Sequence, residues 1–213
     1  MRLYQKIIAL VLFGVAMGYF EAAVVVYLRE LYYPGGFCFP LMDMPGNVLA
    51  VELGREAASL LMLVSVAILT GKRCWERLGV FLATFGIWDI SYYIWLKVTL
   101  GWPLSLTEPD ILFLIPRPWI GPVIAPVLIS IVMIGAGFWI MTRYDRGGTI
   151  APRRPEWVLA LAGTGSILYS FMARAEVTPD GIMPCPYKYW LLCAGLVGYL
   201  AAFGLVVYRT SRY

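Results

Sequence analysis

IIALVLFGVAMGYFEAAVVVYL, residues 7–28, decides the structural class of this protein. An α-helix rises about 1.5 Å per residue, so about 20 apolar residues are needed to cross a hydrocarbon core of about 30 Å. Residues 7–28 meet this length and contain one charged side chain, Glu21. The stretch therefore predicts a transmembrane helix.

The rest of the sequence contains further long apolar stretches. Of the 213 residues, 61% are apolar and 14% are charged, whereas about 25% of residues are charged in a typical soluble domain. We predict an all-α membrane protein in which residues 1–213 form a single polytopic domain. The six expected transmembrane helices span about residues 7–28, 48–71, 78–100, 119–142, 156–173 and 189–208.

The basic residues predict the orientation, because lysine and arginine are retained on the cytoplasmic side of a membrane. With the N-terminus inside, eleven of the 17 basic residues fall on that side. We therefore expect both termini in the cytoplasm and the protein in the inner (plasma) membrane. The eleven residues are Arg2, Lys6, Lys72, Arg73, Arg77, Arg143, Arg146, Arg153, Arg154, Arg209 and Arg212.

The three outer connections differ from the inner ones in composition. Residues 31–47, 101–118 and 175–187 are rich in proline, glycine and aromatic side chains. This composition favours ordered loops that pack over the outer mouth of the bundle, rather than solvated linkers.

Small residues recur every four positions on two of the expected helices. Such spacing lets helices approach closely in lipid. It predicts close helix contacts inside one molecule, in preference to a dimer interface. The two sets are Gly14, Gly18 and Ala22 on the first helix and Ala194, Gly198 and Ala202 on the sixth.

Three carboxylates lie deep within the first three expected spans, one on each. Glu21, Glu56 and Asp89 stand roughly 12, 12 and 16 Å below the outer ends of the first three helices, from the helical rise per residue. A charge at such depth costs about 2.5–3.5 kcal/mol on insertion scales, so it should face the bundle interior and have partners. We expect these acids to meet in one layer.

Further polar residues lie at helical spacing from these acids. Arg55 stands three residues after Glu52 and one residue before Glu56, so one guanidinium could bridge both carboxylates. On the third helix, Asp89, Tyr93 and Lys97 share a face. The predicted ligand- or ion-binding residues are Glu21, Glu52, Arg55, Glu56, Asp89, Tyr92, Tyr93 and Lys97. The alternative is a network of ion pairs that only fixes how the helices pack.

Three functions fit this pattern. The first is an outward-facing pocket, lined by carboxylates, that binds or transports a cation or small polar molecule. The second is a membrane enzyme that acts on a lipid-linked substrate at the outer leaflet, with Glu21, Glu56 and Asp89 as ligands of a divalent metal. The third is an accessory subunit of a larger membrane complex.

The composition also limits cofactors and partners. The chain has no histidine, which excludes His-ligated haem and His-based zinc sites. The composition does not identify a cofactor, and it is compatible with a bound hard divalent cation. The expected partners are the lipid bilayer and other membrane subunits. Nucleic acid is not expected, because the basic residues lie in short connections between helices. Cys38 and Cys185 both fall on outer segments and are the candidate disulfide.

Overall fold

The computed structural model describes residues 2–39, 45–172, 175–178, 181–184 and 186–211 of the chain. Within these residues the protein is a helical bundle with two short β-hairpins. The helices are α1 (Leu3–Tyr32), α2 (Gly46–Thr70), α3 (Cys74–Leu100), α4 (Ile124–Asp145), α5 (Arg154–Met172) and α6 (Tyr189–Thr210). The strands are β1 (Pro109–Phe113), β2 (Trp119–Pro122), β3 (Ala175–Thr178) and β4 (Gly181–Pro184).

Five of the described helices, α1, α2, α3, α4 and α6, are long and apolar enough to cross a membrane. Large apolar side chains on them are exposed, including Phe20 (71%), Leu69 (86%) and Val98 (69%). Exposed apolar surface of this extent fits a lipid environment. α5 has 19 residues, carries Glu156 in its first turn and is not among the five. The structure therefore supports a membrane protein without confirming the sixth span.

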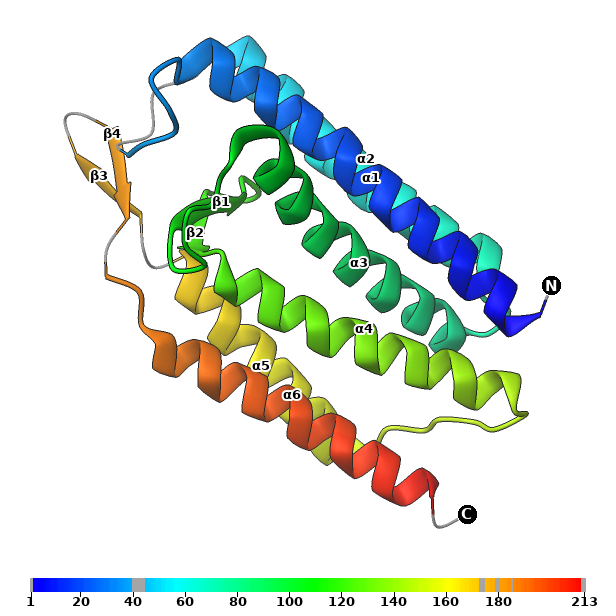
Figure 1. Ribbon diagram of the computed structural model, residues 1–213. Coiled ribbons are helices and arrows are strands. Elements are labelled where there is room, and N and C mark those ends of the chain that lie inside the picture. The colour runs from blue at the N-terminus through cyan, green and yellow to red at the C-terminus, as the bar shows by residue number, and fades with distance from the viewer. Residues whose placement is uncertain (1, 40–44, 173–174, 179–180, 185, 212–213) are drawn as a thin grey trace.

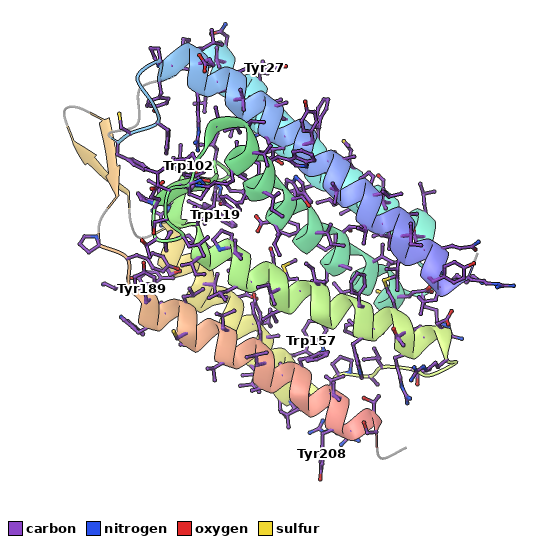
Figure 2. The ribbon with its side chains drawn as sticks, viewed as in Figure 1. Tyr27, Trp102, Trp119, Trp157, Tyr189 and Tyr208 are labelled. Carbon is purple, nitrogen blue, oxygen red and sulfur yellow. The ribbon has the colours of Figure 1, made fainter. Side chains whose placement is uncertain are left out.

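The helices lie alongside one another, with the ends of the chain on one side (Figure 1). The start of α1 and the end of α6 lie at the same end of the bundle, as do the α2–α3 and α4–α5 connections. Both hairpins lie at the opposite end. We call these the terminal end and the hairpin end. Exposed aromatics occur near both, with Trp157 and Tyr208 toward the terminal end and Tyr27 and Tyr189 toward the hairpin end (Figure 2).

The helices form two packing units. α3 packs extensively against α1 and α4, and α2 also packs on α3, so that α1–α4 form one unit. α5 and α6 pair with each other and form the second unit. The two units meet mainly where α5 contacts β2 and where α6 contacts α4.

Glycines permit the closest approaches. A Cβ atom on Gly18 of α1 would lie 2.8 Å from Cβ of Ser91 on α3. A Cβ on Gly195 of α6 would lie 2.9 Å from the carbonyl oxygen of Gly163 on α5. The small residues of α1 thus pack inside the molecule, as expected. On α6, Gly195 and Gly198 make the close approaches to α5 and Ala202 is buried, whereas Ala194 is exposed.

The hairpins correct the all-α prediction. β1 and β2 pair antiparallel, with Asp110 opposite Gly121 and Ile111 opposite Ile120. Residues 119–122, expected as the start of the fourth helix, form a strand because Gly121 and Pro122 are poor helix formers. β3 and β4 form a second antiparallel hairpin.

Candidate functional site

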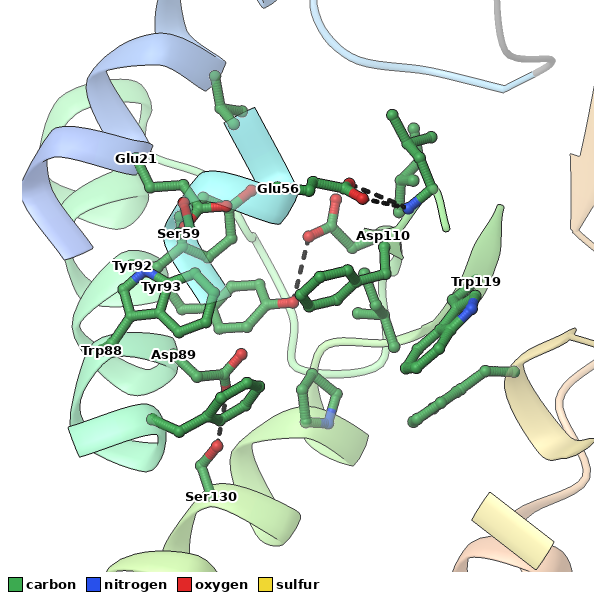
Figure 3. Close-up of a pocket in the computed structure, with 18 of the residues that line it drawn as sticks. Glu21, Glu56, Ser59, Trp88, Asp89, Tyr92, Tyr93, Asp110, Trp119 and Ser130 are labelled. Carbon is green, nitrogen blue, oxygen red and sulfur yellow. Dashed lines mark hydrogen bonds between the residues drawn. The ribbon is translucent and has the colours of Figure 1, made fainter. Parts of the chain in front are cut away.

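A cavity of about 280 Å³ lies toward the hairpin end of the bundle. All six helices, together with β1 and β2, contribute side chains to its walls (Figure 3). The residues that follow β1 and the loop after α1 also line it, through Leu114 and Phe37. Connections at the hairpin end therefore pack over this part of the bundle.

The cavity gathers seven of the eight predicted binding residues. They come from three different helices and are Glu21, Glu52, Arg55, Glu56, Asp89, Tyr92 and Tyr93. The eighth, Lys97, does not line it. Its side chain is exposed and its ammonium group donates to the carbonyl oxygens of Gly101 at 3.0 Å and Pro103 at 2.8 Å.

Arg55 joins two acids from different helices. Its Nε donates to Glu52 Oε2 on the same helix at 2.8 Å, and its Nη1 donates to Glu21 Oε1 on α1 at 2.8 Å. The expected bridge from Arg55 to Glu56 is absent from the described ion pairs, because the Nη1 atom is directed to α1 instead. Glu21 Oε2 is buried and has no hydrogen bond of acceptable geometry, although Glu21 interacts with the buried Trp88 indole.

Glu56 and Asp89 have only neutral partners. Both carboxylate oxygens of Glu56 accept the backbone N–H of Leu114, at 2.9 and 3.1 Å. Asp89 Oδ2 accepts the Ser130 hydroxyl at 2.8 Å. Among the residues that the structure describes, no lysine or arginine forms an ion pair with either acid.

The sequence interpretation missed a second ion pair in the cavity, between Arg29 and Asp110. Asp110 on β1 accepts Arg29 Nη2 at 3.4 Å through Oδ1 and the Tyr93 hydroxyl at 3.2 Å through Oδ2. The Arg29 guanidinium lies 4.4 Å from the ring centre of Phe37 and 3.8 Å from that of Trp102. Burial raises the pKa of Asp110 from 3.8 to about 6, against the opposing effect of Arg29. The available signal was an aspartate immediately before an apolar run, ILFLI at 111–115.

The cavity walls carry more acid than base. Five carboxylates and two guanidinium groups line it, which leaves a surplus of three carboxylates. Uncompensated buried charges are costly, so this surplus must be offset by protons, by water or by a bound cation. The acids are Glu21, Glu52, Glu56, Asp89 and Asp110, and the bases are Arg29 and Arg55.

The opposite wall is apolar and aromatic. Trp119 of β2 lies across the cavity from Glu21 (Figure 3). Its ring stacks on Phe171 of α5, with centroids 6.3 Å apart and planes 17° apart, and contacts Phe113 at 5.4 Å. Ile129 and other apolar residues of α4 and α5 extend this wall. The cavity is thus acidic on one side and apolar on the other.

Two further predictions concern a metal site and a disulfide. Within the described ranges no group of three or more Asp, Glu, Cys or His residues is placed to hold a metal ion, so Glu21, Glu56 and Asp89 do not form such a group there. The candidate disulfide involves Cys185, which lies outside the described residues. Its proposed partner, Cys38, is exposed.

Comparison with known proteins gives no family for this chain. No protein-family model matches it, and no similar protein is found among curated proteins or solved structures. A functional argument must therefore start from the cavity itself.

Proposed function

We propose that this chain is a multi-pass protein of the inner (plasma) membrane whose cavity faces the outer side and binds a cation, for retention or for transport. The single observation that carries the proposal is the surplus of three carboxylates lining one cavity. Two of them, Glu56 and Asp89, accept hydrogen bonds from neutral donors, the Leu114 N–H and the Ser130 hydroxyl. A bound cation would offset the unpaired charge directly.

The proposed topology has six spans with both termini in the cytoplasm. Its support is that α5 lies alongside α6 in the bundle and that the two ends of the chain share one side (Figure 1). An even number of crossings requires that arrangement. The excess of basic residues at the terminal end fits a cytoplasmic location.

Native cysteines can test this topology. Cys38 is exposed near the hairpin end, and Cys74 is exposed at the start of α3, at the terminal end. In a C185S/C193S background, a membrane-impermeant maleimide should label Cys38 in intact spheroplasts. It should label Cys74 only after permeabilisation. Labelling of Cys74 in intact cells would contradict the proposed orientation.

Cation binding can be tested by thermal unfolding of the purified protein at constant ionic strength, with sodium replaced by potassium, calcium or tetramethylammonium chloride. A ligand that binds only the folded state stabilises it by RT ln(1 + [L]/Kd). We expect at least one cation to raise the apparent melting temperature. Glu56→Gln and Asp89→Asn should each reduce this increase.

Matched controls come from exposed acids away from the cavity. Glu30→Gln repeats the chemical change of Glu56→Gln, and Asp145→Asn repeats that of Asp89→Asn. Both controls should keep the full cation-dependent increase. Ser130→Ala retains both carboxylates and serves as a milder variant if the others fail to fold. A response that is absent in the wild type, or unchanged in both cavity variants, would overturn the proposal.

A further inference from the structure

The size of the cavity limits what can fill it. About 280 Å³ is many times the roughly 30 Å³ that one water molecule occupies in the liquid. It approaches the lower end of small-molecule sites, about 300 Å³. A bare inorganic ion would leave most of this volume to water beside apolar walls. A small organic molecule would fill it.

The acidic side offers acceptors for a charged donor. Glu21 Oε2 is buried without a hydrogen bond of acceptable geometry. Among the described residues, Asp89 accepts one side-chain hydrogen bond, from Ser130, whereas an ionised carboxylate can accept about four. An ammonium group supplies up to three N–H donors and one positive charge, so it can use these acceptors and offset one of the three surplus carboxylates.

The opposite side offers apolar surface. Trp119 stacks on Phe171, Phe113 contacts Trp119 with its ring tilted by 45°, and Ile129 and Met133 of α4 continue the wall. A hydrated metal ion gains nothing from such a surface. A hydrocarbon or aromatic group gains about 25 cal/mol for each Å² that leaves water.

We propose that the occupant is an amphipathic organic amine, with its ammonium group on the acidic side of the cavity, which carries Glu21, Glu56 and Asp89, and its apolar body against the wall formed by Trp119, Phe171 and Ile129. This inference rests on the proposed cation binding and narrows it to one class of cation. The lack, within the described parts of the chain, of a three-carboxylate metal group favours the same class.

Equilibrium dialysis of the purified full chain against four probes tests this inference. 2-Phenylethylammonium carries both features, 2-phenylethanol carries only the apolar body, methylammonium carries only the charge, and potassium is the inorganic reference. We expect 2-phenylethylammonium to bind at least about tenfold more tightly than each of the others, a difference of about 1.4 kcal/mol. Empty micelles correct for partitioning into detergent.

Variants on the two sides separate the contributions. Glu56→Gln should weaken 2-phenylethylammonium about tenfold and leave 2-phenylethanol unchanged. Ile129→Thr should weaken 2-phenylethylammonium about threefold to tenfold and leave methylammonium unchanged. Ile131→Thr is the matched control, because Ile131 is 54% exposed on the same helix, and it should change neither.

The outcomes distinguish the two proposals. Potassium or methylammonium binding that depends on Glu56, with no preference for 2-phenylethylammonium, would overturn the amine inference and leave cation binding intact. Equal binding of 2-phenylethanol and 2-phenylethylammonium, insensitive to Glu56→Gln, would overturn both. Tight, Glu56-dependent binding of 2-phenylethylammonium alone would support both.

Discussion

The acids at the two ends of the bundle are paired with basic groups in different ways. At the terminal end, Glu76 and Glu156 each have one cation and one backbone donor. Glu76 contacts Lys6 Nζ at 3.1 Å and the Lys72 N–H at 2.9 Å. Glu156 contacts Arg209 Nη1 at 2.6 Å, as an ion pair without hydrogen-bond geometry, and the Arg153 N–H at 2.9 Å.

At the hairpin end, five carboxylates share two guanidinium groups around one cavity. A one-to-one pairing of acid and base, as at the terminal end, is what a purely structural role requires. An excess of carboxylates around a cavity is costly for stability and is more typical of binding sites. The comparison therefore separates structural ion pairs from a candidate site within one molecule.

The largest expected effect comes from removing the shared cation at the hairpin end. Arg55→Met would leave Glu21 and Glu52 without their guanidinium, and breaking a buried ion pair typically costs about 3–5 kcal/mol. Thermal unfolding in detergent should show a large drop in apparent melting temperature. Adding Glu21→Gln should recover part of it. A melting temperature equal to the wild type would mean that these acids are not buried with Arg55.

The next effect is a pH dependence at Asp110. Because burial raises its pKa from 3.8 to about 6, the folded protein binds more protons than the unfolded chain between these pH values. The free energy of unfolding should therefore fall as pH rises through this window, by at most about 3 kcal/mol, and level off above it. Asp110→Asn should remove this part of the profile, and Asp145→Asn should keep it. Identical slopes in wild type and Asp110→Asn would contradict the prediction.

A smaller effect should follow from separating α1 and α3 near the cavity. Gly18 lies one turn before Glu21, and a Cβ there would come within 2.9 Å of the Trp88 carbonyl oxygen. Overpacking of this kind costs about 1–3 kcal/mol, so Gly18→Val should lower the melting temperature and weaken cation binding. Gly54→Ala on α2 is the control, because nothing lies within 4 Å of its added Cβ. Equal behaviour of both variants would show that the close approach does not matter.

The smallest effect is expected at the terminal end. Glu76→Gln removes one partly exposed ion pair, and ion pairs in contact with solvent contribute about 1 kcal/mol or less. The melting temperature should change little. Cation-dependent stabilisation should be unchanged, since Glu76 does not line the cavity. Loss of the cation response would end the distinction between the two ends.

The sequence predicted the helices well because apolar length is a strong and local signal. It also predicted that Glu21, Glu56 and Asp89 face one interior site, since the cost of charge in lipid leaves few alternatives. The partner of Arg55 could not be predicted, because it depends on how α1 is rotated relative to α2. Asp110 was missed for a related reason: it lies in the expected connection 101–118, and the β1–β2 hairpin turns it back into the cavity.

The division into two packing units has a consequence for any molecule held in the cavity. Its acidic wall belongs mainly to α1–α3, whereas Phe171 and Ile167 of the opposite wall belong to α5. These units share few direct contacts. An occupant that touches both walls would itself form part of the joint between them, so that filling the site and holding α5 and α6 in place become the same event.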